Sequence, residues 1–522
     1  MAASKYSIIP KLLQIVWFYV FIYNSLSDDC PHLCYCHGNR NLTVNCSGLV
    51  LVNPPLTSTS TLTLDLSNNA LGPILNASFI QMRSLTLIDL SQNGLIRLLG
   101  CTFSGMLDLR TVRLRKNLLT SLPDSLFTDN NMIEHLDISF NFFTEIPDDV
   151  FRNIPRLKTL DVSHNQIAQL KLGIKFQVPV HIQVIDLSHN LISAIQSDAF
   201  AVASAWATVT SRTINMAFCR ITSVENEAFS PIPNLNEIDL TGNSAVSMES
   251  LAALVKNLEA KGLERLSLAA MNLTTIVPLF SQVSELPLKF LNVSDNSIAD
   301  LPDNVFSKLR NLRVLDLSRN SLSALTGGFS NLTNLNVLNL SRNVMESFQG
   351  EAVTSLSNLH TLDLSYNKIS GSSHVNFSPL LNLNDLKVNN NLLNLAVLPN
   401  RTSHLRHLDY HSNKITEFNG IDDATMLEFV DLSNNELTSL PGLLFKGARF
   451  LKLVNFSRNH IGVLDHGAFL PQSSIVIDLS YNFLKELRYS NWVATQKLYI
   501  NNNQLANIDN QAFYGMTGLE EL

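Results

Sequence analysis

The stretch Leu85-Thr86-Leu87-Ile88-Asp89-Leu90-Ser91-Gln92-Asn93-Gly94-Leu95 decides the fold, because its pattern L-x-x-L-x-L-x-x-N-x-L recurs from Thr61 to the end of the chain. The position of Asn93 marks nineteen successive turns, most of them 22 to 25 residues apart. It is occupied by Asn69, Asn93, Asn117, Asn141, Asn165, Asn190, Cys219, Asn243, Met271, Asn296, Asn320, Asn343, Asn367, Asn391, Asn413, Asn435, Asn459, Asn482 and Asn503. Such a period is the signature of a leucine-rich repeat.

Each turn contains alternating leucines, which follow the two-residue period of a strand and point to one side of it. One turn cannot bury its leucines alone, so stacked turns must form a continuous core. The fold class predicted is an α/β leucine-rich-repeat solenoid, a horseshoe with a parallel concave sheet, with about 19 full repeats and a partial one. The repeated Asn is expected to satisfy backbone groups of adjacent turns, and a recurring Phe to form a second packed row on the return side.

The first residues resemble a secretory leader. Lys5 and Lys11 precede an apolar run from Leu12 to Tyr23, and Ser25 and Ser27 follow it. We therefore expect residues 1–27 to be a signal peptide; an uncleaved membrane anchor is the alternative. The whole 522-residue chain has a formal charge of −7, and it contains no polybasic run, so no nucleic-acid partner is expected.

Four cysteines follow the leader: Cys30, Cys34, Cys36 and Cys46. In an oxidising compartment they are most simply two disulfides, for which three pairings exist. A zinc site is the weaker alternative, because the spacing C-x3-C-x-C-x9-C lacks two C-x2-C pairs. Cys101 and Cys219 lie five turns apart, beyond disulfide reach, and both are expected to be buried free thiols.

The cysteine cluster followed by Val44-Asn45-Cys46 resembles the N-terminal cap of extracellular leucine-rich-repeat proteins such as Slit and the Nogo receptor. The repeats are similar to those of Toll-like receptors, chaoptin and the acid-labile subunit. The resemblance implies disulfides Cys30–Cys36 and Cys34–Cys46. It also implies a cysteine-rich cap over residues 28–58 and a solenoid over residues 59–522, which we expect to be truncated within its twentieth repeat.

Two turns are longer than the others. One carries an insertion from Ala201 to Thr210 around Trp206, and the other has apolar residues three and four apart between Met248 and Leu258. The second pattern predicts a helix that stops at Lys261-Gly262. These turns are either drift towards a longer repeat class or an irregular zone with a function.

The candidate ligand site lies on the first turns. Asp occupies the outward position between the core leucines in eleven turns, a feature of the generic repeat that neighbouring Ser can satisfy. Arg113 and Arg115 reverse the sign on the concave face, and Phe140, His164 and His189 are expected at outward strand positions of later turns. Arginine and aromatic side chains are frequent interface anchors, which favours a ligand patch here. A solvated network of salt bridges is the alternative.

Ten N-x-S/T sequons fit a secreted glycoprotein. They are Asn41, Asn45, Asn76, Asn272, Asn292, Asn331, Asn339, Asn376, Asn400 and Asn455. Asn292, Asn339 and Asn455 share the outward strand position, where glycans would cover the middle and C-terminal sheet. That placement favours ligand binding between Asp65 and Asp186 or at a lateral edge, unless the strand sequons are never modified.

No motif of a hydrolase, metalloprotease or nucleotide-binding enzyme occurs, so we expect no enzyme, no cofactor and no metal. The leading function is the protein-binding ectodomain of a cell-surface receptor or adhesion molecule, with an extracellular protein ligand or a homophilic partner. A secreted binding or carrier glycoprotein and a Toll-like pattern-recognition ectodomain are the alternatives. Any membrane attachment is expected beyond Leu522.

Overall fold

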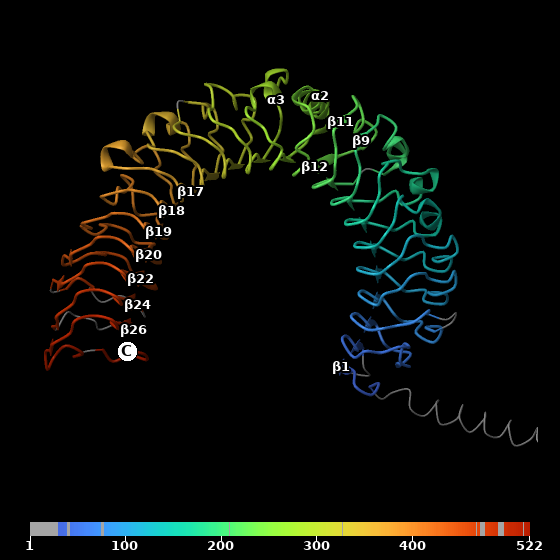
Figure 1. Ribbon diagram of the computed structural model, residues 1–522, viewed down its shortest axis with the longest axis horizontal. Helices are drawn as coiled ribbons and strands as arrows, with labels where there is room; N and C mark the ends of the chain where they lie inside the picture. The colour runs from blue at the N-terminus through green and yellow to red at the C-terminus, as the bar shows by residue number, and fades with distance from the viewer. Residues whose placement is uncertain are drawn as a thin grey trace, which may run out of the picture. The chain divides into compact units, whose positions relative to one another are not determined.

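The computed structural model describes residues 30–38, 42–74, 78–207, 209–325, 327–465, 467–469, 475–488, 495–514 and 516–522 (Figure 1). The predicted signal peptide and the sequons Asn41 and Asn76 lie outside these ranges. The chain forms two compact units, residues 1–239 and 240–522, and each is described by itself. No helix among the described residues is long and apolar enough to span a bilayer.

The first unit is a stack of short strands joined by turns. Its strands and 3-10 helices are β1 (Tyr35–His37), β2 (Thr43–Asn45), β3 (Thr63–Asp65), β4 (Leu87–Asp89), β5 (Thr111–Arg113), β6 (His135–Asp137), η1 (Asp148–Asn153), β7 (Thr159–Asp161), η2 (Ile174–Gln177), β8 (Val184–Asp186), β9 (Ala194–Ile195), η3 (Ala201–Ala205), β10 (Arg212–Asn215), β11 (Ser223–Val224) and β12 (Leu235–Asp239). Strands β2 to β8, β10 and β12 pair parallel in chain order, β1 pairs antiparallel with β2, and β9 pairs with β11.

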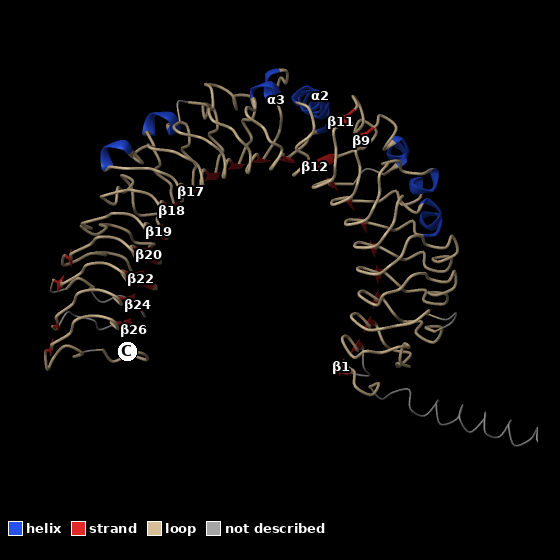
Figure 2. Cartoon of the chain, in the orientation of Figure 1, coloured by secondary structure: helices blue, strands red, loops and turns tan. Residues whose placement is uncertain are grey.

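The second unit repeats the arrangement with two α-helices. It contains α2 (Met248–Leu258), η4 (Glu259–Lys261), β13 (Arg265–Ser267), α3 (Val277–Ser281), β14 (Phe290–Asn292), β15 (Val314–Asp316), β16 (Val337–Asn339), η5 (Gly350–Val353), β17 (Thr361–Asp363), η6 (Ser372–His374), β18 (Asp385–Lys387), β19 (His407–Asp409), β20 (Phe429–Asp431), β21 (Ser439–Leu440), β22 (Leu453–Asn455), β23 (Val463–Leu464), β24 (Ile475–Asp478), β25 (Glu486–Leu487), β26 (Thr495–Tyr499) and β27 (Asn507–Ile508). In each unit the strands of the main sheet line one side and the helical segments lie on the other (Figure 2). The predicted parallel-sheet solenoid of about 19 turns is confirmed.

In the strands β4, β6 and β7 the central residue is buried and its neighbours are more exposed, as the alternating pattern predicts. Ile88, Leu136 and Leu160, for example, are at most 1% exposed. The return side carries the expected Phe row, in which Phe103 and Phe127 stack with ring centroids 5.8 Å apart. The inward strand residues and the Phe row together form one core that runs through each unit.

The repeated Asn forms the expected ladder, here called the asparagine ladder. Asn141 Nδ2 donates to the carbonyls of Leu114 and Ile138 at 3.0 Å, and its Oδ1 accepts from Leu119 N at 3.0 Å. Asn165 and Asn93 donate to the preceding turn in the same way. Each ladder Asn therefore ties its own turn to its neighbour and leaves few buried backbone groups unpaired.

The residue before each ladder Asn has a left-handed backbone. The φ angles of Lys116, Phe140, His164, His189 and Phe218 lie between 52° and 55°. The expectation that Phe140, His164 and His189 occupy strand positions was therefore wrong, because strand β6 ends at Asp137, three residues earlier. The left-handed turn after the strand moves these side chains to the edge where the chain leaves the sheet.

The two turns that are longer than the others have ordered structure. The predicted helix is α2, which Ser247 caps by accepting from Ser250 N at 3.2 Å and which is followed by Gly262 with φ 71°. In the insertion from Ala201 to Thr210, of which residue 208 is not described, Trp206 Nε1 donates to Phe176 O at 3.1 Å.

Beside Trp206, sequence reasoning missed Arg212, which is 1% exposed. Its guanidinium donates to the carbonyls of Ile182, Ala207 and Pro233 at 2.8, 2.5 and 2.5 Å. The insertion is thus closed around a buried cation that is held by backbone oxygens.

The six cysteines form two disulfides and two free thiols. The disulfides Cys30–Cys36 and Cys34–Cys46 are both present, as the resemblance implied. Cys219 is a buried free thiol, but the expectation that Cys101 is buried was wrong, since it is exposed. Cys101 lies in the turn before Phe103, and the Phe side chain fills the core there while the thiol faces outward.

Candidate functional site

The acidic residues that end the sheet strands are held by their own turns. Asp137 Oδ1 accepts from Ser139 N at 2.9 Å and from Ser139 Oγ at 2.6 Å, and Asp186 accepts from Ser188 in the same way. Burial raises the pKa of Asp161, and the nearby charges of Asp137 and Asp186 raise it further. These contacts support the interpretation that Asp at this position is a feature of the generic repeat and is satisfied by the neighbouring Ser.

Arg113 interrupts this row at the end of strand β5. Its Nη1 lies 3.4 Å from Asp89 Oδ2. It borders a hollow of about 360 Å³ over strands β5 to β7, lined by Thr111, Val112, Arg113, His135, Leu136, Asp137, Thr159 and Asp161. Arg113 therefore lies on the sheet face, where it forms an ion pair with Asp89 of the neighbouring strand.

The other four predicted residues come together at the turn edge. The guanidinium carbon of Arg115 lies 4.1 Å from the centroid of the Phe140 ring. The Phe140 and His164 rings stack at 3.7 Å, and the His164 and His189 rings at 4.0 Å. Phe218, which sequence reasoning missed, stacks on His189 at 4.9 Å. We call Phe140, His164, His189 and Phe218 the aromatic ladder.

The repeat explains why these rings meet. Each occupies the same place in successive turns, directly before the asparagine-ladder position, with nearly the same φ. Adjacent parallel strands lie about 4.8 Å apart, which is close to the separation that stacked rings prefer. The signal for Phe218 was its place before Cys219, the residue that replaces Asn in that turn.

The charged groups at the end of the aromatic ladder are Arg115 and Lys116. Arg115 Nη1 donates to Ser139 Oγ at 3.1 Å, and Lys116 Nζ lies 5.6 Å from the Phe140 centroid. Neither cation has a carboxylate within 4 Å among the described residues. Burial lowers the pKa of His164, with smaller contributions from His189 and Arg115, so this ring is neutral at neutral pH.

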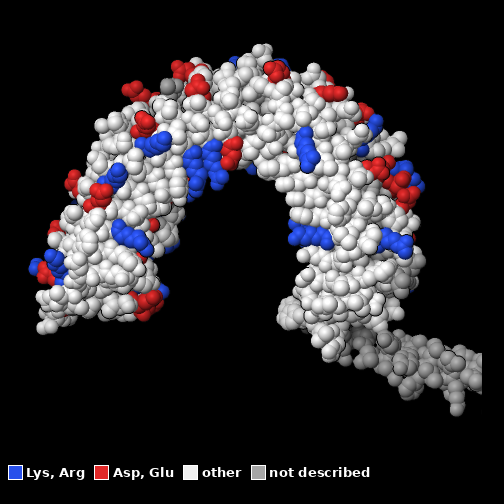
Figure 3. Space-filling view, in the orientation of Figure 1, with Lys and Arg blue, Asp and Glu red and all other residues white. Residues whose placement is uncertain are grey.

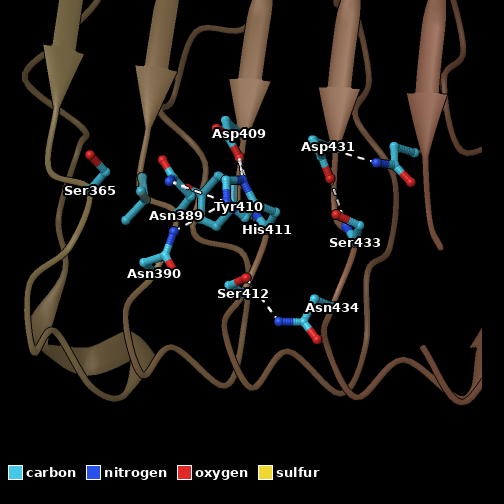
Figure 4. Close-up of polar contacts among 12 residues, drawn as sticks. Ser365, Asn389, Asn390, Asp409, Tyr410, His411, Ser412, Asp431, Ser433 and Asn434 are labelled. Carbon is cyan, nitrogen blue, oxygen red and sulfur yellow. Dashed lines mark hydrogen bonds and ion pairs between the residues drawn. The ribbon is translucent and has the colours of Figure 1, made fainter. Parts of the chain in front are cut away.

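A second polar cluster lies in the other unit, at the end of strand β19. His411 Nδ1 lies 2.7 Å from Asp409 Oδ1, and its Nε2 lies 3.1 Å from Asn390 Nδ2 (Figure 4). The hydrogen bond to Asp409 raises the pKa of His411, and burial opposes it. The neighbouring Tyr410 replaces a core leucine and donates its hydroxyl to Val397 O. This cluster pairs its polar atoms internally, so it offers fewer unpaired groups than the aromatic ladder.

The strand sequons have the position predicted for them. Asn292, Asn339 and Asn455 end strands β14, β16 and β22 and are half-buried. Asn339 Nδ2 lies 3.1 Å from Asp316 Oδ2, and Asn455 Nδ2 lies 3.2 Å from Asp431 Oδ2. The described sequons outside the strands of the second unit are exposed, as is Asn45 in β2; they are Asn272, Asn331, Asn376 and Asn400.

Charges of both signs are interspersed over most of the viewed face, and one group of cations stands out on the second unit (Figure 3). A protein that binds a nucleic-acid backbone along its length needs a basic stripe. On the face of the first unit seen in Figure 3, Lys and Arg form no such stripe.

Comparison with known proteins finds leucine-rich-repeat matches along the chain. The leucine-rich-repeat family model matches residues 108–167 and 287–345, and a second leucine-rich-repeat model matches residues 358–380. Human leucine-rich repeats and immunoglobulin-like domains protein 1 is 32% identical over 153 residues, 28% of this chain and 14% of that protein. Lumican of Oryctolagus cuniculus is 31% identical over 134 residues, 25% of this chain and 68% of lumican.

Solved structures share the fold. The Drosophila Toll structure, solved as a Toll–Spatzle complex, has a TM-score of 0.63 at 21% identity and covers 87% of this chain and 61% of that one. The mouse RP105/MD-1 structure has a TM-score of 0.61 at 20% identity and covers 94% and 83%. With its asparagine ladder, its disulfide-bonded cap and its match over two thirds of lumican, this chain belongs to the leucine-rich-repeat family.

Proposed function

We propose that this chain is the non-enzymatic, protein-binding ectodomain of a cell-surface receptor or adhesion molecule. In this proposal residues 1–27 direct it into the secretory pathway, residues 28–58 cap the first turn, and residues 59–522 form the binding solenoid. Two disulfides in the cap support an oxidising compartment, because such bonds are rare in reducing ones. The exposed sequons are the proposed glycosylation sites.

One observation carries the proposal: the repeat aligns Arg115, Phe140 and His164 into a continuous stack on a rigid scaffold. Ordered aromatic and arginine side chains lose little entropy on binding, which makes them effective interface anchors. Arg113 and the hollow on strands β5 to β7 extend the same surface onto the sheet. We therefore assign the ligand site to Arg113, Arg115, Phe140, His164 and His189.

A Toll-like ectodomain is the second candidate, favoured by the fold shared with Drosophila Toll. The solved relatives hold protein partners, Spatzle for Toll and MD-1 for RP105. For this chain we extend only the class of partner, an extracellular protein, and not its identity.

The test uses the full chain, secreted from cultured cells, on an array of purified extracellular proteins from the same organism. We expect at least one partner whose binding is reduced about tenfold or more by the double variant Arg115→Ala/Phe140→Ala. The matched control is Arg342→Ala/Tyr366→Ala, because Arg342 lies 4.1 Å over Tyr366 in the other unit. Equal binding by all three proteins would exclude the site.

A further inference from the structure

The aromatic ladder presents ring edges to its surroundings. Its rings stack at 3.7, 4.0 and 4.9 Å with interplanar angles of 17°, 10° and 16°, so each inner ring has both faces covered by its neighbours. Phe218 is 49% exposed and His189 is also exposed. A partner that approaches this surface must therefore contact edges, where the hydrogens and ring nitrogens lie.

The edges of the two phenyl rings are electropositive. The quadrupole of a phenyl ring is negative on its face and positive at its edge, so Phe140 and Phe218 present partial positive charge. A neutral imidazole carries one N–H donor and one acceptor nitrogen, and a protonated one carries two donors. The ring nitrogens of His164 and His189 make no hydrogen bond with other described residues, so these donors are available to a ligand.

Two full positive charges stand at one end of the same surface. Arg115 is oriented by its hydrogen bond to Ser139 and by the Phe140 ring, and Lys116 is exposed beside it. At the repeat position of Lys116 in the other unit, Arg319 lies 3.4 Å from Asp295 and is thereby neutralised. Arg115 and Lys116 have no such partner among the described residues.

The nearest acids limit where an anion can approach. Asp137, Asp161 and Asp186 lie on the strands, and each accepts hydrogen bonds from its own turn. Their charge repels a second carboxylate over the sheet face, which leaves the turn edge as the favourable path.

From these observations we propose that the edge of the aromatic ladder, with Arg115 and Lys116 at its end, binds the carboxylates of an acidic segment in a protein partner. This inference rests on the proposed function and adds the chemistry of the ligand. A single-stranded nucleic acid fits less well, because base stacking needs a free ring face and the inner rings have none.

Binding of a carboxylate at this surface should depend on pH. His164 faces His189, Arg115 and Asp186, and its neutral form is favoured in the free protein. A bound carboxylate stabilises the protonated imidazoles, so affinity must rise as the pH falls below the ordinary histidine value of about 6.5. A contact made only by Arg115 and Lys116 would not change over this range.

The probe is a fluorescent deca-glutamate peptide, with deca-glutamine and a thymidine decanucleotide as comparisons, measured by anisotropy at pH 5.5 and 7.5. We expect the glutamate peptide to bind, deca-glutamine not to bind, and Arg115→Gln/Lys116→Gln to weaken binding about tenfold. His164→Phe/His189→Phe keeps the stack but removes the ring nitrogens, so it should abolish the pH dependence. Arg319→Gln/Arg342→Gln removes two charges from the other unit, both at the repeat position of Lys116, and should have little effect.

Loss of affinity in that control equal to the loss in Arg115→Gln/Lys116→Gln would overturn the proposal, since it would indicate unspecific attraction. Tighter binding of the decanucleotide than of the peptide would also overturn it, in favour of a nucleic-acid ligand. If the peptide binds as expected but no natural partner depends on Arg115 and Phe140, the carboxylate site stands and the proposed function fails. Thermal unfolding of each variant distinguishes a lost contact from a lost fold.

Discussion

Cys219 Sγ donates to the carbonyl oxygen of Leu187 at 3.3 Å, just as Asn190 Nδ2 donates to Val162 O at 3.0 Å one turn earlier. The thiol therefore retains the hydrogen bond to the preceding turn that the asparagine ladder makes elsewhere. Met271 has no donor to offer at this position, although its backbone N–H still donates to Asn296 Oδ1 at 3.0 Å. The asparagine ladder continues through Cys219 and loses its side-chain donor at Met271.

The two free thiols should react very differently with an alkylating reagent. Burial raises the pKa of Cys219 to about 11, so almost no thiolate forms at pH 8, whereas Cys101 is exposed. Since the thiolate is the reactive species, iodoacetamide should label Cys101 in the native protein and spare Cys219. Peptide mass spectrometry measures both, and labelling in guanidinium chloride is the control. Rapid native labelling of Cys219 would show that this turn opens readily.

Replacing Asn141 should destabilise the first unit strongly. Asn141→Ala removes hydrogen bonds to Leu114 O, Ile138 O and Leu119 N, all in the interior. Unpaired buried backbone groups cost roughly 1–3 kcal/mol each, so we expect a loss of about 3 kcal/mol or more. Urea unfolding gives the value. Asn503 makes similar bonds but is only half-buried, and Asn503→Ala should cost clearly less.

The asparagine ladder could be predicted because each Asn bonds only to its own turn and to the adjacent one, which the repeat places beside it. The helix from Met248 to Leu258 could be predicted because its apolar residues follow the helical period within one segment. The errors have another origin. The two-residue period of the sequence predicted that Phe140 lies on the strand. In the structure the strand ends at Asp137 and Phe140 has a left-handed backbone, and the spacing of apolar residues carries no information about the φ angle. Arg212 was missed because a lone arginine usually indicates surface, and its four carbonyl partners come from three separate segments.

The buried Arg212 should be essential to the inserted turn. Burial lowers the pKa of Arg212, and its charge is held by the carbonyls of Val180, Ile182, Ala207 and Pro233. Arg212→Ala leaves these oxygens unpaired and a cavity behind, so we expect a loss of about 3–5 kcal/mol. Differential scanning calorimetry tests it against Arg220→Ala, an exposed arginine eight residues away. Equal stability of the two variants would contradict the structural role.

His411 should make the second unit more stable in mild acid. The pKa of His411 in the folded protein is raised by its hydrogen bond to Asp409, so its stabilising contribution is complete below the unfolded value of about 6.5. That contribution is lost as the pH rises through the folded pKa. We expect the unfolding temperature of the wild type to fall between pH 6 and 8 more than that of His411→Gln. His404→Gln, which removes an exposed histidine, is the control and should follow the wild type.

Glycosylation should separate the sequons by their hydrogen bonds. Oligosaccharyl transfer needs the Asn side-chain nitrogen, and in Asn339 and Asn455 this atom lies against Asp316 and Asp431 at 3.1 and 3.2 Å. A glycan there would also have to stand on the sheet, among neighbouring strands about 4.8 Å away. Enzymatic deglycosylation in heavy-oxygen water, followed by peptide mass spectrometry, should therefore mark exposed sites such as Asn331 and leave the two strand sites unmarked. Substantial occupancy of Asn339 would mean that transfer precedes folding of this turn, and that the glycan displaces the bond to Asp316.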